Sequence, residues 1–353
     1  MKIDKSELVK KINVLEKVIP TKPSIACMEG ILVHDGRMCA NDLQNAISIA
    51  TPEAENECFI IPRKAIAMAK SLPDGLVQIT PQTDNSIVIK AGTIRTKMNS
   101  FSPDAFPDNH MLEDAEETTM DIDDLCDMLS SVAYATAATE SRPVQTGVLL
   151  DGDGKNLNVV ACDGFRSAWA QTPYAEPVNM IIPKSTVKLI LSIREGEKIS
   201  IQKKGEKAVF TIGNYQVFSR LLLGNFFDYK RIFPTRQYSI GVEREALLDA
   251  MRRIMICSDD TKKGKVEMDG SGTSLKIISN SSTAGYMEEI EVQNEFKSDM
   301  RVMFNATFFI DALKSYGCNV VDCFFGEKST DPTVLDDGQL KSLILPVRMA
   351  NKT

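Results

Sequence analysis

Several residue types and motifs on which enzymes rely are scarce or missing in this sequence of 353 residues. It has only two histidines, His34 and His110, and neither lies in a recognisable catalytic motif. This scarcity argues against His-based acid–base or triad chemistry. No Gly-rich phosphate loop or nucleophile elbow is present, and Gly270-Ser271-Gly272 lies among polar residues as a turn would. We therefore expect a protein that is not an enzyme and carries no cofactor.

The cysteines lack the spacing of a metal site. None of the eight forms a CxxC pair, the closest two (Cys318 and Cys323) are five positions apart, and no histidine lies near one. Unpaired thiols in a reducing compartment are the better interpretation. No apolar run is long enough to span a bilayer, and the N-terminus lacks the apolar core of a signal peptide. We expect a cytoplasmic protein without a bound metal.

The chain carries little excess charge of either sign. Its 48 acidic and 41 basic residues give a net charge of −7, which argues against coating of DNA by a uniformly basic surface. A local basic face remains compatible with that total. With 43% hydrophobic and 25% charged residues, the composition is that of a globular protein large enough for two or three domains.

An internal repeat organises the sequence. The segments 59–80, 180–201 and 302–325 each read as strand, short helix, tight turn and strand. Pro62 and Pro183 are 121 positions apart, and Pro183 and Asn305 are 122 apart. Proline suits a first helical turn because its missing N–H would be unpaired there, and Asn305 fits as a helix N-cap.

Other features recur at the same period. Asp42 and Asp163 end strands 121 positions apart, and Phe106-Pro107 and Phe226-Phe227 close the first two copies. Apolar stripes with helical spacing begin each copy, at Leu8, Ile12, Leu15 and Val18, at Leu125, Met128 and Leu129, and at Leu247, Leu248, Met251 and Ile254. The sequence predicts an α+β fold of three related domains, 1–117, 118–237 and 238–353, each with helices packed on β-sheets. The acidic stretch 108–119 is predicted to link the first two.

The second predicted helix of each copy is rich in basic residues. The three helices hold seven basic residues against one acid, Asp311: Arg63, Lys64 and Lys70, then Lys184, Lys188 and Arg194, then Lys314. A single basic run is usually a solvated helix face. Three equivalent helices with the same bias favour a shared surface that faces a polyanion through its phosphates.

Three motifs carry a resemblance to a known family, and it extends over the whole chain. Val160-Ala161-Cys162-Asp163-Gly164-Phe165-Arg166 is similar to the family's Ala-Thr-Asp-Gly-His-Arg-Leu. Phe227-Asp228-Tyr229-Lys230-Arg231-Ile232 and Leu345-Pro346-Val347-Arg348-Met349 are similar to Pro-Asp-Tyr-Arg-Arg-Val and Met-Pro-Met-Arg-Leu. In this order on a three-repeat chain, they resemble the beta subunit of bacterial DNA polymerase III, the sliding clamp.

The resemblance implies a head-to-tail homodimer whose six domains close into a ring around duplex DNA. Such a ring has the clamp fold, slides without sequence specificity and is a non-catalytic processivity factor. Its partners would be the DNA polymerase III catalytic subunit, the clamp loader and other proteins with a clamp-binding motif. Besides the basic helices, Lys22 would face DNA, and Phe106 and Ile256 would join the subunits.

The resemblance also implies a hydrophobic pocket for partner peptides between the second and third domains. Its residues would be Cys162, Gly164, Phe165, Arg166, Ser167, Phe227, Arg231, Ile232, Leu343, Leu345, Pro346, Val347 and Arg348, with Asn305 and Phe308 at the rim. Phe165, Ser167 and Phe227 stand where the family commonly has His, Leu and Pro. These departures put the peptide preference of the pocket in question.

One alternative keeps the family and changes the assembly. A phage-type or divergent relative would bind partner proteins as a monomer or open ring without encircling DNA. The mass in solution distinguishes the two possibilities, because a homodimer doubles the 39.0 kDa of the chain.

Overall fold

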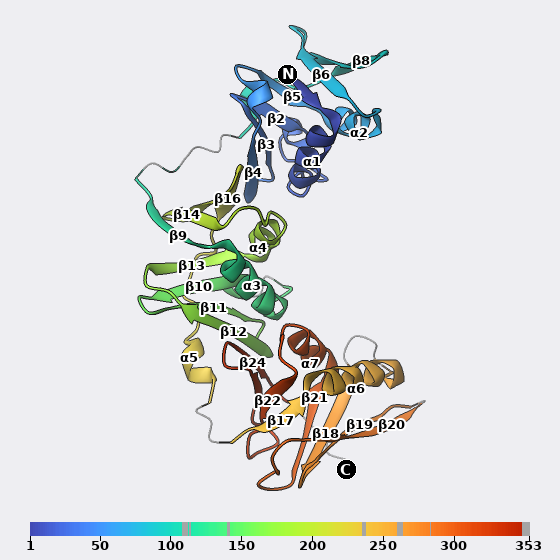
Figure 1. The fold of residues 1–353 in the computed structure, drawn as a ribbon, viewed down its shortest axis with the longest axis vertical. Coiled ribbons are helices and arrows are strands. Elements are labelled where there is room, and N and C mark those ends of the chain that lie inside the picture. The colour runs from blue at the N-terminus through green and yellow to red at the C-terminus, as the bar shows by residue number, and fades with distance from the viewer. Residues whose placement is uncertain are drawn as a thin grey trace. The chain divides into compact units, whose positions relative to one another are not determined.

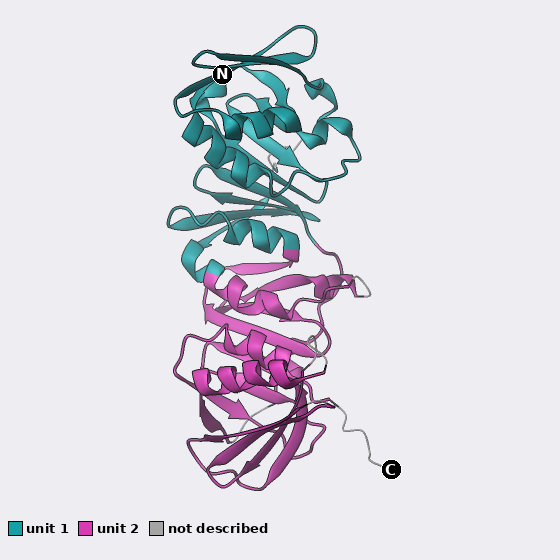
Figure 2. Cartoon of the chain, turned by 90° about the vertical axis from the view of Figure 1, so that its right-hand side faces the viewer, with its two compact units in different colours: residues 1–126, 185–221 teal, residues 127–184, 222–353 magenta. Residues whose placement is uncertain are grey.

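The computed structural model describes residues 1–347 except 108–111, 113, 140–141, 235–237, 260–263 and 283. The chain divides into two compact units, coloured separately in Figure 2. Unit 1 comprises Met1–Cys126 and Ser185–Leu221, and unit 2 comprises Asp127–Lys184 and Leu222–Thr353. Among the described residues, each unit contains one eight-stranded and one four-stranded sheet, and every pair of neighbouring strands is antiparallel.

Unit 1 is built on sheets that combine distant parts of the sequence (Figure 1). The larger sheet has the order β5 (Cys58–Ile61), β2 (Ile31–His34), β3 (Arg37–Asn41), β4 (Asn45–Ala50), β16 (Tyr215–Arg220), β15 (Lys207–Ile212), β14 (Lys198–Lys204) and β9 (Glu116–Asp121). The smaller has the order β1 (Lys2–Asp4), β6 (Leu76–Pro81), β7 (Ser86–Ala91) and β8 (Ile94–Asn99). The helices of this part are α1 (Lys5–Leu15), α2 (Arg63–Ser71) and α4 (Lys184–Leu191), and α3 (Ile122–Val132) begins here and runs on into unit 2.

Unit 2 repeats the same plan. Its larger sheet has the order β13 (Pro177–Pro183), β10 (Gly147–Asp153), β11 (Asn156–Cys162), β12 (Arg166–Pro173), β24 (Leu340–Ile344), β23 (Thr333–Asp336), β22 (Val320–Phe324) and β17 (Ile240–Glu243). The smaller has the order β20 (Gly285–Glu291), β19 (Ser274–Asn280), β18 (Lys265–Ser271) and β21 (Met300–Asn305). The helices are α5 (Tyr229–Ile232), α6 (Arg244–Cys257) and α7 (Ala306–Leu313).

The predicted apolar stripes are the buried faces of the long helices. Leu8, Ile12 and Leu15 of α1 are fully buried, and so are Leu125 and Leu129 of α3. In α6 the buried residues are Leu247, Leu248, Ala250, Met251 and Ile254. Burial of one stripe per helix supplies most of the free energy that holds these helices on their sheets.

Helix starts also follow the sequence closely. The Asn305 side chain accepts a hydrogen bond from the Thr307 backbone N–H at 3.0 Å, as predicted for an N-cap. Pro62 and Pro183 each lie one residue before their helices, which begin at Arg63 and Lys184, so the prediction of proline inside the first turn is off by one position. Pro62 has extended backbone angles and Pro183 still belongs to β13, which explains the shift.

Two strand pairs join neighbouring copies of the repeat into continuous sheets. In unit 1, β4 pairs with β16, and Asn45 lies opposite Ser219. In unit 2, β12 pairs with β24, and Arg166 lies opposite Ile344. The larger sheet of each unit therefore contains strands from two copies of the repeat.

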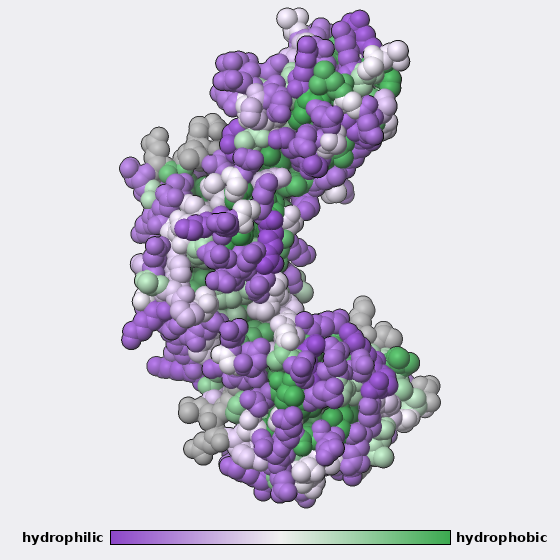
Figure 3. All heavy atoms as spheres, viewed as in Figure 1, coloured by the Kyte–Doolittle hydropathy of each residue, from purple (hydrophilic) through white to green (hydrophobic). Residues whose placement is uncertain are grey.

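The view in Figure 3 shows a mostly hydrophilic surface on which hydrophobic side chains form smaller separate areas. The more exposed of the large apolar residues are Leu76, Phe165, Leu223, Ile256 and Met287. Within the described part of the chain, no helix combines the length and apolar character needed to cross a membrane.

Candidate partner-binding and DNA-facing sites

The turn between β11 and β12 presents an exposed aromatic side chain in unit 2. One carboxylate oxygen of Asp163 accepts hydrogen bonds from the backbone N–H groups of Phe165 (2.9 Å) and Arg166 (3.0 Å). Gly164 has φ of +90°, a conformation that side-chain-bearing residues rarely adopt. The turn holds the Phe165 side chain in solvent, where it is 64% exposed.

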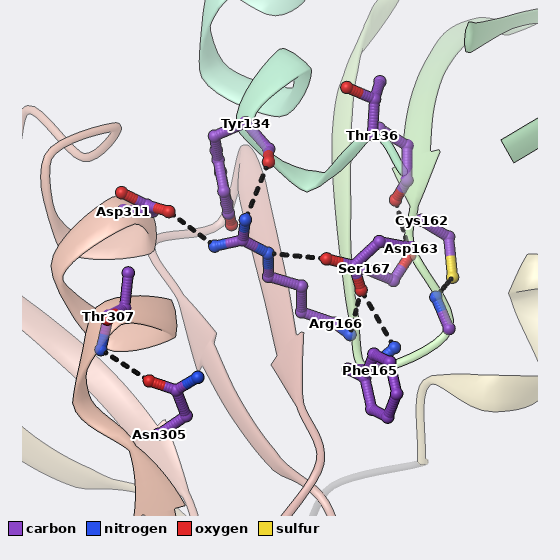
Figure 4. Close-up of polar contacts among 12 residues, drawn as sticks. Tyr134, Thr136, Cys162, Asp163, Phe165, Arg166, Ser167, Asn305, Thr307 and Asp311 are labelled. Carbon is purple, nitrogen blue, oxygen red and sulfur yellow. Dashed lines mark hydrogen bonds and ion pairs between the residues drawn. The ribbon is translucent and has the colours of Figure 1, made fainter. Parts of the chain in front are cut away.

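Arg166 points in the other direction, into a set of polar and aromatic groups (Figure 4). Its Nε donates to the second carboxylate oxygen of Asp163 at 3.0 Å, one terminal nitrogen donates to Asp311 of α7 at 2.7 Å, and the other donates to the Tyr134 carbonyl at 3.0 Å. The guanidinium carbon lies 5.2 Å from the centre of the Tyr134 ring and 4.6 Å from that of Phe308. The side chain is only 12% exposed.

A buried hydroxyl group lies beside this arrangement. The Tyr134 hydroxyl donates to the Ser342 hydroxyl at 2.9 Å. The Tyr316 hydroxyl donates to the Leu335 carbonyl at 2.9 Å and is hydrogen-bonded to the Ser342 hydroxyl, also at 2.9 Å. Burial raises the pKa of both tyrosine hydroxyls above the usual value of 10.0. The two phenols therefore stay neutral donors at physiological pH.

The residues after β24 lie against the same turn. The backbone N–H of Leu345 donates to the Phe165 carbonyl at 2.9 Å, and the N–H of Val347 donates to Met303 of β21 at 2.7 Å. Leu345 is 37% exposed, whereas Leu343 is buried. Pro346 and Val347 are half-buried. Leu345 and Phe165 thus present adjacent apolar surface at the junction of β12 and β24.

The predicted second motif is divided between an apolar cluster and the solvent. Phe227 stacks on Phe226 with ring centres 4.8 Å apart, and both pack against buried Leu149 and Tyr229. Arg231 is largely exposed and pairs with Asp228 at 2.8 Å. Ile232 is 37% exposed.

Other predicted pocket residues are buried or already engaged. Cys162 and Ser167 are 7% and 1% exposed, and the Ser167 hydroxyl donates to the Ala161 carbonyl at 2.9 Å. Asn305 is 8% exposed and caps α7, while Phe308 lies over Arg166. Arg348 lies outside the described residues.

Trp169 was missed by the sequence analysis although it links the two apolar clusters of this region. Its ring lies 5.2 Å from the Tyr229 ring and 5.4 Å from the Phe233 ring, both edge-on. Phe233 packs with Leu343, and Tyr229 packs in the cluster that Phe227 joins. Trp169 lies in the middle of β12 and belongs to none of the sequence motifs. Its position between the two clusters is therefore evident only from the folded sheet.

The basic residues of the second helices differ in how they are engaged. Arg63, Lys64, Lys188 and Lys314 are exposed, as is Lys22 in its loop, and Lys184 is half-buried. Lys70 forms an ion pair with Glu16, and Arg194 forms one with Asp123. Acidic residues of the first helical segments thus balance two of these charges. The sequence analysis overlooked these acids because it counted charges along the second helices alone.

Two of the edge strands, β8 and β20, carry charge of one sign that the sequence analysis missed. Among the described strands, β8 pairs only with β7, and β20 pairs only with β19. Within its bounds β8 carries Arg95 and Lys97 and no acid, while β20 carries Glu288, Glu289 and Glu291 and no base. Open edges expose backbone donors and acceptors that pair readily with another strand.

The two predicted interface residues differ sharply in exposure. Phe106 is 7% exposed and belongs to a core cluster of unit 1 with Cys27, Met28 and Ile60. Ile256, near the end of α6, is 83% exposed. Ile256 therefore presents exposed apolar surface that another copy could contact, whereas Phe106 presents little exposed surface.

A metal centre finds no support in the described part of the chain, which holds no group of three or more His, Cys, Asp or Glu side chains suited to a metal ion. No disulfide joins any of the eight cysteines, all of which lie in the described residues.

Two sequence models of one family match adjoining parts of the chain. The central domain of the DNA polymerase III beta subunit matches residues 119–228, and its C-terminal domain matches residues 230–348. The chain belongs to this family. Members of the beta sliding clamp family are non-catalytic processivity subunits, so the predictions of a clamp fold and of a processivity factor that is not an enzyme are confirmed.

Relatives and solved structures agree along the whole chain. The beta sliding clamps of Halalkalibacterium halodurans and Staphylococcus epidermidis are 25% and 23% identical, over 98% of each chain. The sliding clamp structure from Bacillus subtilis superposes with a TM-score of 0.90 at 22% identity, covering 99% of both chains. The beta subunit structure from Streptococcus pyogenes superposes with a TM-score of 0.91 at 20% identity, again over 99% of both.

Proposed function

We propose that two copies of this clamp close head to tail into a ring that encircles duplex DNA and slides along it. The ring tethers the DNA polymerase III catalytic subunit, the clamp loader and other proteins with a clamp-binding motif through the apolar surface around Phe165 and Leu345. We expect the protein to act in the cytoplasm. We also expect each copy to consist of three domains, with boundaries after residues 117 and 237.

The charge of the two open edges carries this proposal. Strands β8 and β20 are six and seven residues long, and their outward residues have opposite sign. Arg95 and Lys97 are two positions apart and so share one face of β8, as Glu289 and Glu291 do on β20. Antiparallel pairing of β8 from one copy with β20 from the next would extend both sheets and bring these charges together.

Such a contact joins unlike surfaces, so each copy uses a different edge toward each neighbour. A heterologous contact of this kind gives a closed ring when the rotation between copies closes. Two copies with two contacts satisfy both of these charged edges, β8 and β20, in each copy.

Charge reversal tests the head-to-tail arrangement. The first variant carries Arg95→Glu and Lys97→Glu, and the second carries Glu289→Lys and Glu291→Lys. We expect each variant alone to have the monomer mass of 39.0 kDa by light scattering, because like charges across an interface cost several kcal/mol. Mixed together, the variants should form a dimer of twice that mass, since both contacts then join opposite charges.

The matched control reverses Lys204 and Lys207, two cations of unit 1 that lie opposite each other on β14 and β15 rather than on an open edge. This control should keep the mass of the unaltered protein, and thermal unfolding should show that every variant is folded. If the unaltered protein is a monomer at micromolar concentration, the ring is wrong. If the mixture stays monomeric while the unaltered protein is a dimer, the copies are joined by other surfaces.

The exposed cations of α2 and α4, together with Lys314 at the C-terminal cap of α7, support a DNA-facing role for the second helices. Contacts from Lys64, Lys188 and Lys314 to phosphate oxygens would carry no sequence information, as sliding requires. Sequence-specific binding would contradict this role.

The alternative is a clamp-like protein that binds partners and does not encircle DNA. It shares the peptide site and differs only in assembly. A monomer that binds partner peptides with undiminished affinity would favour it over the ring.

A further inference from the structure

The structure assigns Arg166 the role of a positioning residue, which fixes the Phe165 turn on α7 and does not itself bind the partner peptide. This inference rests on the proposed peptide site and concerns how that site keeps its shape. The resemblance to clamps implied that Arg166 lines the pocket, and the contacts of its side chain point to a different role.

The hydrogen-bonding capacity of Arg166 is largely used within the protein. A guanidinium has five N–H donors on three nitrogens. Each nitrogen already donates to an acceptor of the chain: Nε to Asp163, and the terminal nitrogens to Asp311 and to the Tyr134 carbonyl, at 2.7–3.0 Å. Charge-assisted bonds of this kind are the strong ones, and a peptide would have to compete with two carboxylates.

Two aromatic rings also lie close to the guanidinium. Tyr134 and Phe308 both lie within cation–π distance, at 5.2 and 4.6 Å. These contacts leave the side chain 12% exposed, against 64% for the neighbouring Phe165. In Figure 4 the Phe165 ring points away from the guanidinium. The surface available to a partner is therefore Phe165, and Arg166 is behind it.

Asp163 transmits the position of Arg166 to the exposed ring. One of its carboxylate oxygens holds the backbone N–H of Phe165, and the other holds the Arg166 Nε. Asp311 in turn fixes the guanidinium to α7. Loss of either ion pair would free Asp163 to rotate and would loosen the turn that presents Phe165.

The first junction of the chain repeats this arrangement with different residues. Asp42 accepts hydrogen bonds from the backbone N–H groups of Gln44 (2.9 Å) and Asn45 (2.6 Å), as Asp163 does from Phe165 and Arg166. Asn45, 121 positions before Arg166, bonds to Ser185 and Thr186 of α4 at 3.1 and 2.6 Å. In both junctions the residue that ends the turn fastens it to the second helix of the following copy.

A double-mutant cycle on peptide affinity tests the role. The variants are Arg166→Ala, Asp311→Ala and the two combined, titrated with a fluorescein-labelled peptide of the Gln-Leu-x-Leu-Phe type. We expect each single change to weaken binding by about tenfold, and the double variant to be weaker than either single one by no more than about twofold. The peptide affinity of Arg166→Lys should fall between that of the unaltered protein and that of Arg166→Ala, because one ammonium group cannot reach all three acceptors.

Direct recognition by Arg166 predicts a different pattern. Arg166→Ala would then weaken binding while Asp311→Ala left it unchanged, or the two losses would multiply in the double variant. Either result overturns the positioning role. No binding by the unaltered protein would overturn the peptide site itself, and this inference with it.

A matched ion pair controls for general destabilisation. Arg301 and Glu267 pair at 2.7 Å between β21 and β18 of the same unit. Arg301→Ala and Glu267→Ala should leave the peptide affinity within about twofold of the unaltered protein, with any effect confined to the unfolding temperature. A loss of peptide affinity in these controls equal to that in Arg166→Ala would also overturn the specific role of Arg166.

Discussion

Asn45 and Arg166 lie opposite the ends of β16 and β24, at corresponding places in two strand junctions. Asn45 pairs with Ser219, and Arg166 pairs with Ile344. After each pair the next residue of the partner strand donates its backbone N–H to the turn, Arg220 to Gln44 and Leu345 to Phe165. The exposed positions thus hold polar Gln44 and Arg220 at the first junction and apolar Phe165 and Leu345 at the second. Of the two junctions, the second is the one suited to an apolar peptide.

The stability of the first junction depends on Thr186. Its buried hydroxyl bonds to the Asn45 side-chain oxygen at 2.6 Å and to the Ser219 hydroxyl at 2.7 Å. Thr186→Val keeps the shape and leaves buried polar atoms unpaired, so we expect a loss of about 1–3 kcal/mol in the free energy of unfolding. Urea denaturation measures it, with half-buried Thr211→Val expected to cost under about 0.5 kcal/mol. Equal losses in the two variants would contradict the importance of the Thr186 network.

Phe165 is the predicted anchor of the peptide site. Because its side chain is mostly exposed, Phe165→Ala should leave thermal unfolding nearly unchanged and weaken peptide binding by roughly tenfold, as expected when an aromatic contact is lost from an interface. Phe165→His, which restores the residue common in the family, should retain most of the affinity. Unchanged affinity in Phe165→Ala would remove this ring from the site.

If the second helices face DNA, exposed cations should contribute more to DNA binding than cations that are already paired with an acid. Lys188→Ala should lower the salt dependence of duplex association by about one charge, because the contact releases counterions from phosphate. Arg194→Ala should have a smaller effect, since Asp123 already balances that charge. Affinity for duplexes of unrelated sequence, measured over a range of salt, gives both slopes. The reverse order of the two effects would place Arg194 rather than Lys188 on DNA.

On the open edge β8, Lys97 forms an ion pair with Asp84 at 2.6 Å. Hydrogen bonds from Lys97 and Ser86 lower the pKa of Asp84 from 3.8 to about 2. Because the folded-state pKa is depressed, the stabilising contact is present above pH 3.8 and is lost as the pH falls toward 2. Lys97→Met should move the pKa of Asp84 back toward 3.8, as measured by carbon NMR of the carboxyl group. A value that stays near 2 would assign the whole effect to Ser86.

The sequence predicted the parts of the fold that depend on local pattern. The apolar stripes of α1 and α6 and the Asn305 cap follow from residues close together in the chain, and the period near 121 positions follows from the recurrence of such local patterns. The open edges β8 and β20 did not follow, because an edge is defined by the absence of a neighbouring strand. The ion pairs of Lys70 and Arg194 and the bridge from Arg166 to Asp311 were also missed, since each joins residues 54 to 145 positions apart.

The sequence analysis assigned residues to the peptide site from their positions in the motifs, and it could not assess whether each side chain is exposed. Phe165, Ile232 and Leu345 present apolar surface, whereas Ser167 and Cys162 are buried in the sheet. A motif identifies the strand and turn that carry a site. Which side chains face a partner depends on the alternation of β12 and on its pairing with β24.

Topological retention on DNA tests the ring most directly. The two charge-reversed variants, monomeric alone, are mixed in the presence of a closed circular plasmid, so that rings form around some of the DNA. We expect part of the mixture to stay with the circular plasmid through gel filtration at high salt, where phosphate contacts are weak, and to be released when one restriction cut makes the plasmid linear. Equal retention on circular and linear plasmid, or none on either despite dimer formation, would contradict a ring that encircles DNA.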